Sequence, residues 1–463
     1  MRMAQAGTSR DGSALFQKLG AFIQSEMARL SVPGVAVGVQ YGGAEYLAGF
    51  GVTSITNPLP VDGDTIFQIG STTKTFTATA AMRLVEEGKL DLDTPVRRYI
   101  PSLELQSEET AARVTLRHLF NHTGGWLGDY FDDTGPGDDA RARIVERMVD
   151  LPQLTPLGEV WSYNNAAFYI AGRMIEIASG QTYEQAIHDL VFAPLRMDRS
   201  FFYPEDVMVH RFAVGHIVGS NETHVALPWG LTRATYPAGA VASTARDQLR
   251  YARFQMGDGT NPNGERLLQR ATMDEMQAPT TPAGSNSGAV GITWMVNEID
   301  GTKLVRHGGA TNGQMSAFLF APDEGFAITV LTNANRGVEL HGSTVNWALR
   351  EYLGLVEPEP PLLERTAEQL AEYAGRYHAA LSDLDLTVED GVLVLQATPR
   401  GGFPLRDSKP GDPPPPTRLT LHQDERVIGV DTPYKGARGE FLRDTDGAIE
   451  WLRFGGRIAK RER

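Results

Sequence analysis

Ser71 and Lys74 stand three positions apart at the start of an alanine-rich segment, residues 72–87, that predicts a helix. This spacing would place both side chains on one helix face. A serine hydroxyl is a weak nucleophile until a neighbour accepts its proton, and a lysine amine can do so when burial or nearby positive charge lowers its pKa. Alone, the same pair also fits a helix N-cap followed by a solvated lysine, so both interpretations stay open.

A second pattern places Tyr163 and Asn165 two positions apart, as on an extended loop. A tyrosine hydroxyl could pass a proton between a nucleophile and a leaving group, as general acid–base catalysis requires. The amide of Asn165 could orient Lys74 or a substrate carbonyl. Taken singly, a buried tyrosine beside a tight turn explains the same residues.

A third pattern, His307-Gly308-Gly309-Ala310, follows a predicted strand. Two glycines allow a substrate to approach the backbone closely. The N–H of Ala310 could then join the N–H of Ser71 as an oxyanion hole, with His307 beside the nucleophile as a polar or titrating group. An ordinary turn would have the same composition.

The elements that must position these residues follow from hydrophobic periodicity. Residues 13–30 predict a first helix with Ser13 as its N-cap. Further helices are expected at 116–120, 141–150, 166–179 and 346–353. Strands are expected at 35–40, 44–50, 291–296, 304–307, 315–320 and 326–331. Helices in the middle of the chain with strands at both ends predict an α+β layered fold.

The long loop at residues 124–139 is rich in glycine, aspartate and aromatic residues. Loops of this length are more often functional than structural connections. Trp126 and Tyr130 are therefore candidates for an aromatic wall of the substrate pocket. The alternative is that they pack the loop onto the body of the protein.

Composition limits the class of protein. The 463 residues carry a formal net charge of −14 and no cysteine, which excludes disulfides, thiolate metal sites and a cysteine nucleophile. An acidic balance without a basic patch argues against nucleic-acid binding. Residues 1–20 contain no apolar run long enough for a signal peptide or a membrane span, so we expect a cytoplasmic protein without a membrane partner.

The last part of the chain differs in kind. Residues 357–371 begin with a proline-rich linker, and residues 372–463 form short alternating runs separated by glycine and proline. That pattern predicts an all-β sandwich or small barrel. The expected organisation is a main domain at 1–356, the linker at 357–371 and the β module at 372–463.

Together the three motifs resemble the penicillin-recognising serine hydrolase superfamily, with its Ser-x-x-Lys, Tyr-x-Asn and Lys/His-x-Gly motifs. More narrowly, the chain is similar to the class C β-lactamase-like branch, peptidase family S12. The resemblance extends over about residues 15–353 and includes further segments: 67–71, 87–93, 116–124, 163–169 and 237–244. Residues 372–377 resemble the opening of a lipocalin-like barrel appended to some of these hydrolases.

The resemblance implies a fold and a set of roles. The fold would be an antiparallel sheet flanked by helices, with an all-helical subdomain and a C-terminal β-barrel. The roles would be Ser71 as acyl-accepting nucleophile, Lys74 as acylation base, Tyr163 as proton relay, Asn165 as a partner of Lys74 or of the substrate amide, His307 in the third motif, Ser71 and Ala310 as oxyanion hole, and Gly308 and Gly309 at the substrate. The family mechanism uses no metal and no cofactor.

One departure bears on the substrate. True β-lactamases of this branch carry Lys-Thr-Gly where this chain has His307-Gly308-Gly309, which offers a weaker charge and no hydroxyl. We therefore expect a hydrolase of peptide, amide or ester bonds, of D-amino-acid peptidase, carboxypeptidase or esterase type, acting on a small molecule or short peptide. The alternatives are an acyltransferase or peptide cyclase, a true β-lactamase, or a degenerate relative that only binds or assembles. The β module could cap the cleft or mediate a homo-oligomer.

Overall fold

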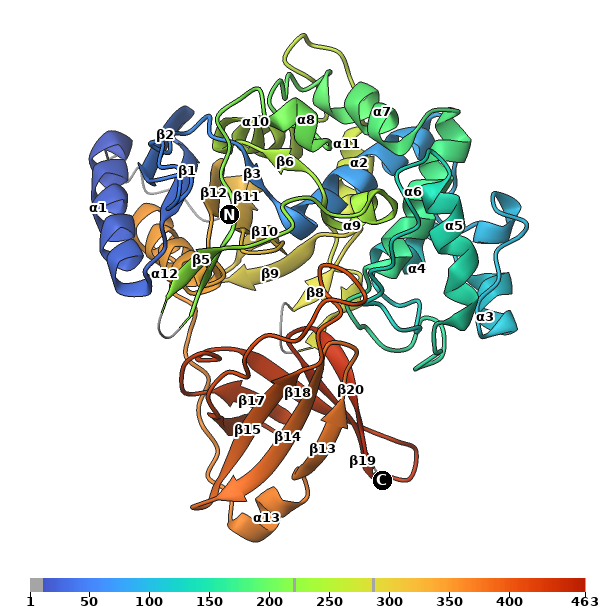
Figure 1. The fold of residues 1–463 in the computed structure, drawn as a ribbon, viewed down its shortest axis with the longest axis vertical. Coiled ribbons are helices and arrows are strands. Elements are labelled where there is room, and N and C mark those ends of the chain that lie inside the picture. The colour runs from blue at the N-terminus through green and yellow to red at the C-terminus, as the bar shows by residue number, and fades with distance from the viewer. Residues whose placement is uncertain (1–10, 220–221, 285–287, 463) are drawn as a thin grey trace, which may run out of the picture.

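The computed structural model describes residues 11–219, 222–284 and 288–462 (Figure 1). The first ten residues, on which the expectation of a chain without a signal peptide partly rests, lie outside this range. Within the described residues, no helix combines the length and the apolar character needed to cross a membrane.

An eight-stranded antiparallel sheet forms the centre of the larger part of the chain. Its strands follow the order β2-β1-β12-β11-β10-β9-β8-β7. They are β1 (Gly34–Tyr41), β2 (Ala44–Gly51), β7 (Thr281–Pro282), β8 (Ala289–Val290), β9 (Met295–Ile299), β10 (Thr302–Ala310), β11 (Met315–Ala321) and β12 (Phe326–Thr332). Two small ribbons pair β3 (Phe67–Gln68) with β6 (Ala242–Ser243), and β4 (His216–Val218) with β5 (Thr223–Val225). Strands from both ends of this part therefore meet in one sheet, since β1 pairs with β12.

Helices cover both faces of this sheet, which confirms the expected α+β fold class. α1 (Gly12–Leu30) and α12 (Gly337–Ala348) pack on one face, as Figure 1 shows. α10 (Ala245–Met256) packs on the other face, next to α2 (Thr73–Glu86). The remaining helices of this part are α3 (Glu108–Arg113), α4 (Leu116–Phe120), α5 (Ala140–Glu146), α6 (Ala166–Ser179), α7 (Tyr183–Ile187), α8 (Pro204–Val207), α9 (Tyr236–Gly239) and α11 (Arg270–Met276).

Helix α1 begins one residue earlier than its periodicity predicts, and its cap differs. The carboxylate of Asp11 accepts hydrogen bonds from the backbone N–H groups of Ser13 and Ala14, at 3.0 and 3.4 Å. Asp11 is thus the N-cap, and Ser13 lies inside the first turn. A carboxylate is favoured there because it satisfies free N–H groups and meets the positive end of the helix dipole.

Two other expectations are corrected. The strand expected at 291–296 is present only from Met295, because residues 291–294 form the bend that connects the paired strands β8 and β9. Within that bend Thr293 has a left-handed φ of 72°, and its N–H bonds to the carbonyl of Phe120. The helix expected at 346–353 begins at Gly337, where glycine and β-branched residues weaken the local signal. Burial of Leu340 against the sheet stabilises the early turns.

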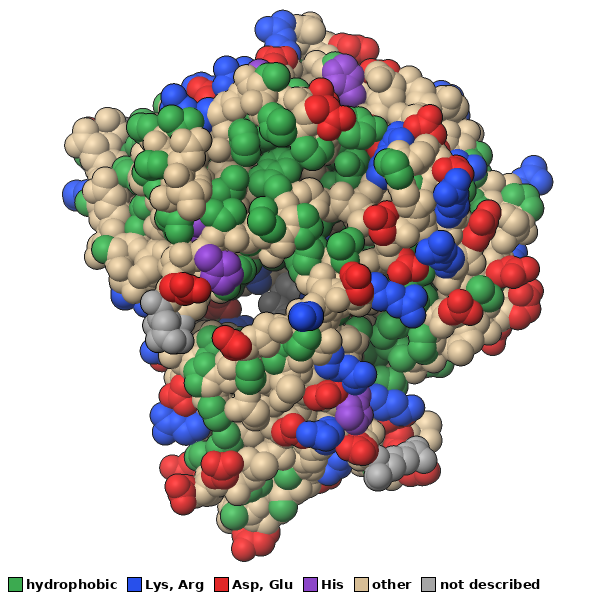
Figure 2. Space-filling model, in the orientation of Figure 1, with side chains coloured by type: hydrophobic (Ala, Val, Ile, Leu, Met, Phe, Trp, Pro, Cys, Tyr) green, Lys and Arg blue, Asp and Glu red, His purple; other side chains and the backbone are tan. Residues whose placement is uncertain are grey.

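The C-terminal part forms a closed barrel, which confirms the expected all-β module. Residues 354–366 carry no helix or strand and lead to the short helix α13 (Ala367–Ala371). The barrel strands are β13 (Gly375–His378), β14 (Ser382–Glu389), β15 (Val392–Pro399), β16 (Thr417–Gln423), β17 (Arg426–Gly429), β18 (Arg438–Arg443), β19 (Ile449–Phe454) and β20 (Arg457–Arg461). Alternate residues such as Leu384, Leu386, Leu393 and Leu395 fill its interior. Figure 2 shows that the surface is hollowed where the barrel meets the rest of the chain.

Candidate active site

Ser71 lies in a short 3-10 turn, Gly70–Thr72, that leads from strand β3 into helix α2. Lys74 occupies the first turn of α2 and is fully buried. Its Nζ lies 3.1 Å from Ser71 Oγ, 2.7 Å from Asn165 Oδ1 and 2.6 Å from the carbonyl oxygen of Ala238. A neutral amine that donates its two hydrogens to Asn165 and Ala238 would turn its lone pair toward the Ser71 hydroxyl. This arrangement suits proton transfer from serine to lysine.

The environment of Lys74 favours the neutral amine. Burial holds the pKa of Lys74 well below its usual value, and the positive charge of Arg457 lowers it further. The carboxylate of Asp129 opposes this shift. The net effect is a lowered pKa, so the neutral amine that can act as a base is more accessible than in an exposed lysine.

Tyr163 lies beside Ser71 in a stack of rings. Its ring centroid is 4.5 Å from that of His122, and the Arg457 guanidinium lies 4.9 Å from it. Burial raises the pKa of Tyr163, although a hydrogen bond with Ser71 works in the opposite direction. The phenol is therefore protonated at neutral pH and can donate a proton next to the serine.

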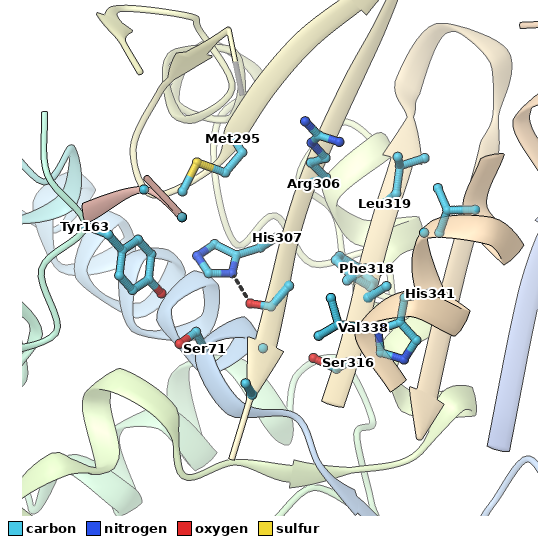
Figure 3. Close-up of a pocket in the computed structure, with 18 of the residues that line it drawn as sticks. Ser71, Tyr163, Met295, Arg306, His307, Ser316, Phe318, Leu319, Val338 and His341 are labelled. Atoms are coloured by element: carbon cyan, nitrogen blue, oxygen red, sulfur yellow. Dashed lines mark hydrogen bonds between the residues drawn. The ribbon is translucent and has the colours of Figure 1, made fainter. Parts of the chain in front are cut away.

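His307 projects from β10 toward Tyr163, as Figure 3 shows. Its Nδ1 lies 2.7 Å from the carbonyl oxygen of Gly308, so Nδ1 carries the hydrogen of the neutral ring. Its Nε2 is buried without a hydrogen-bond partner among the described residues. Burial, with the nearby charge of Lys74, lowers the pKa of His307 to about 3. The third motif therefore presents a neutral imidazole at neutral pH.

The backbone around Ser71 packs tightly against the end of β10. A Cβ atom at Gly309 would lie 1.9 Å from the carbonyl oxygen of Ile69 and 2.7 Å from Ser71 N. Gly70 has a φ of +51°, and a Cβ atom there would lie 2.4 Å from Ala310 N. Only glycine allows this approach, which brings the backbones of residues 70–71 and 309–310 together.

These residues surround one cavity of about 580 Å³. Ser71, Tyr163, His307, Gly308, Gly309 and Ala310 line it, while Lys74 contacts both Ser71 and Asn165 beneath it. Strand β11 and helix α12 form the far wall, where Figure 3 shows Phe318, Leu319, Val338 and His341. Trp161 and Tyr163 contribute aromatic side chains to the lining. No group of three or more metal-ligating side chains occurs in the described ranges.

Two residues expected at the substrate lie elsewhere. Trp126 is 3% exposed and packs in the hydrophobic core. Tyr130 lines a separate cavity of about 420 Å³, and its hydroxyl donates to Asp132. The structure thus brings neither side chain to the cavity that Ser71 lines, and both help to fix the 124–139 loop.

Three neighbours of the site have roles that the sequence did not suggest. Asp129 lies in the long loop at residues 124–139, which contains several aspartates, so the sequence does not distinguish it from the others. His122 precedes that loop and accepts a hydrogen bond from Asn164 N at 3.0 Å. Arg457 lies in the last strand of the barrel, where no local pattern distinguishes it from Arg461. Its partner Asp129 is 328 residues away in the sequence.

Known proteins are similar to most of this chain. The Beta-lactamase family model matches residues 19–349. Penicillin-binding protein 4 of Amycolatopsis lactamdurans is 33% identical over 355 residues, covering 75% of this chain and 93% of that protein. The region matched by the family model therefore ends before the barrel.

Two solved structures also extend over the barrel. The crystal structure of SurE with D-Leu superimposes with a TM-score of 0.73 at 24% identity, covering 97% of this chain and all of that one. The octameric penicillin-binding protein homologue from Pyrococcus abyssi gives a TM-score of 0.63 at 24% identity, covering 96% of this chain and 100% of its own. At this identity, both likenesses concern the fold.

Proposed function

This chain belongs to the beta-lactamase family of serine hydrolases, and we propose that it cleaves a peptide, amide or ester bond through an acyl-enzyme on Ser71. The observation that carries the proposal is the buried Lys74 amine, 3.1 Å from Ser71 Oγ at the edge of an open cavity. A structural lysine would not need a serine partner facing a cavity of substrate size.

The proposed reaction has two halves. In acylation, Lys74 accepts the Ser71 proton while Oγ bonds to the carbonyl carbon, and the N–H groups of Ser71 and Ala310 stabilise the oxyanion. The bond to the leaving group then breaks, and the proton passes to that group through the hydroxyl of Tyr163. In deacylation, a water molecule gives a proton to Lys74 through Tyr163 and bonds to the acyl carbon. The bond between that carbon and Ser71 Oγ then breaks, and Lys74 returns a proton to Oγ. Asn165 holds Lys74 throughout, through the contact at 2.7 Å.

The third motif supports a substrate other than a β-lactam. His307 is neutral at physiological pH and Gly308 has no hydroxyl, so these two positions of the third motif offer neither the lysine charge nor the hydroxyl that hold a carboxylate in the Lys-Thr-Gly motif. The D-Leu in the SurE structure supports a substrate that contains a D-amino acid. The octameric homologue from Pyrococcus abyssi supports a homo-oligomer.

The test is covalent labelling of the full chain. A fluorophosphonate probe should add one adduct to the wild type and none to Ser71→Ala, as measured by intact mass. A panel of p-nitrophenyl esters, D- and L-aminoacyl anilides and nitrocefin then ranks the substrate classes, and we expect esters and D-aminoacyl anilides to turn over faster than nitrocefin. An added amine acceptor shows whether the acyl group passes to an amine instead of water. Absence of both a Ser71-dependent adduct and turnover of the panel would contradict the proposal and favour the binding or assembly alternative.

A further inference from the structure

The C-terminal barrel contributes backbone and side chains to the cavity that Ser71 lines. The turn between β19 and β20 places Gly455, Gly456 and Arg457 in its wall. The carbonyl of Gly456 accepts a hydrogen bond from Tyr163 N at 2.8 Å. The barrel therefore binds the backbone of the tyrosine next to the nucleophile.

Two further contacts hold the same segment. Arg453 of β19 donates to the carbonyl oxygen of Trp161 at 2.6 Å, and Ile458 N lies 3.3 Å from Ser162 Oγ. Three consecutive residues of the second motif, 161–163, thus each contact the barrel. A surface module that only packed on the outside would not make contacts at this depth.

Arg457 extends these contacts to charged and polar side chains. Its Nε lies 2.6 Å from one carboxylate oxygen of Asp129, and its Nη2 lies 3.2 Å from the other. The Asp129 side chain is 4% exposed. Burying a carboxylate is costly unless it has partners, and Arg457, whose side chain is 37% exposed, provides one.

Asp129 connects this ion pair to Lys74 through one amide. Asn165 Nδ2 donates to Asp129 Oδ1 at 2.8 Å, while Asn165 Oδ1 accepts from Lys74 Nζ at 2.7 Å. A carboxylate accepts hydrogen bonds only, so it selects the NH₂ side of the amide and turns the oxygen toward the lysine. With the amide reversed, its NH₂ group would face the lysine and its oxygen would face the carboxylate.

We infer that Arg457 is a positioning residue of the active site, which acts through Asp129 to fix the Asn165 amide that holds Lys74, so that the barrel takes part in the reaction. This inference rests on the proposed function of Ser71 and Lys74. It assigns to the barrel a purpose beyond capping or assembly.

The electrostatics of Lys74 provide a readout that a purely structural contact would not affect. The groups that face Lys74 are Arg457, Asp129, Tyr163 and the neutral rings of His122 and His307. Arg457 lowers the pKa of Lys74 and Asp129 raises it. Removing Arg457 should therefore raise the pKa of Lys74, whereas removing Asp129 should lower it.

The experiment uses full-length variants and an ester that the wild type hydrolyses. Arg457→Gln should lower kcat by about 100-fold with a smaller change in KM, because the base is displaced while the cavity remains. The rising limb of kcat/KM against pH should move to higher pH in Arg457→Gln and to lower pH in Asp129→Asn. Arg457→Lys, which keeps the charge, should recover part of the rate.

Arg418→Gln is the matched control, because Arg418 is a barrel arginine paired with Asp431 on the exposed side, at 2.7 Å. It should leave kcat and the pH profile unchanged. Circular dichroism establishes that each variant is folded, and if Arg457→Gln is not, Asp129→Asn decides the question through the pH limb. An unchanged profile in folded Arg457→Gln or Asp129→Asn, or limbs that move in the same direction in these two variants, would overturn the inference. A wild type that fails to label at Ser71 would instead overturn the proposed function.

Discussion

Lys74 Nζ lies 3.1 Å from Ser71 Oγ, inside the first turn of helix α2 and out of contact with solvent. The contact joins a residue that is normally charged and exposed to one that is normally unreactive. The base, the proton relay, the oxyanion hole and the stability of the fold can each be tested by a separate measurement.

Replacing Lys74 with methionine should lower kcat/KM for ester hydrolysis by at least ~100-fold, because the serine then lacks a base. The fold should persist, since methionine fills a similar volume in a buried site. The measurement is steady-state hydrolysis of a p-nitrophenyl ester together with the rate of fluorophosphonate labelling. Retention of most of the labelling rate would show that another group activates the serine.

The pH profile of the wild type should reflect the shifted lysine. Burial lowers the pKa of Lys74, so the neutral base is populated at a lower pH than for a lysine in water. The kcat/KM curve should therefore reach half its maximum well below pH 10.5, the ordinary value for this group. A rising limb centred at or above that pH would contradict the assignment of Lys74.

Replacing Tyr163 with phenylalanine should lower kcat by about 100-fold or more while leaving the thermal midpoint nearly unchanged. The phenylalanine ring can keep the 4.5 Å stack on His122, so only the hydroxyl is lost. Burst kinetics would show which half-reaction suffers. A variant as active as the wild type would exclude the hydroxyl from the proton route.

Gly309→Ala should lower kcat/KM by about 100-fold, because the new Cβ pushes Ser71 N away from its place in the oxyanion hole. Gly308→Ala is the control on the same strand, since its Cβ would meet only the carbonyl oxygen of Ser316, at 3.3 Å. This control should keep its activity within about tenfold of the wild type. Equal losses in the two variants would contradict the predicted oxyanion hole.

Acid should destabilise the protein through its buried histidines. Burial lowers the pKa of His341 to about 3, whereas in the unfolded chain this group has its ordinary pKa of 6.5. Stability is thus greatest above about pH 6.5 and falls as the pH drops toward 3, because only the unfolded state takes up the proton. Between about pH 7 and pH 5 the contribution lost is about 2 kcal/mol.

The matched variant is His341→Gln, which keeps a polar partner for Thr332 Oγ1, 3.2 Å from the imidazole Nε2. Urea unfolding at both pH values gives the free energies of unfolding. The variant should lose about 2 kcal/mol less than the wild type on acidification. The same loss in both proteins would show that His341 does not contribute.

The five side chains that carry the proposed chemistry could be selected from the sequence because each belongs to a short local pattern. Ser71 and Lys74 are one helical turn apart, and Tyr163 and Asn165 are two positions apart on an extended segment. Contacts within such spacings follow from backbone geometry alone. Strands β1, β2, β11 and β12 and helix α6 can be recognised for the same reason, since their apolar residues repeat with the period of the element.

Other features depend on tertiary packing. Thr293 lies in the bend between β8 and β9, where its N–H bonds to the carbonyl of the distant Phe120, and Trp126 enters the core instead of the cavity because its loop folds back on the body. Nothing near Arg457 indicates that it meets Asp129. That contact depends on how the barrel docks, and docking is decided by the shapes of two assembled surfaces and not by any local pattern.

The chain itself thus defines the reacting groups, the layered body and the C-terminal barrel, because periodicity and motif spacing act over a few residues. Only the folded structure decides that Lys74 is buried, that His307 is neutral and that the barrel contacts Tyr163. Burial and electrostatic environment are properties of the whole assembly, since each depends on groups that the chain brings together from hundreds of residues apart.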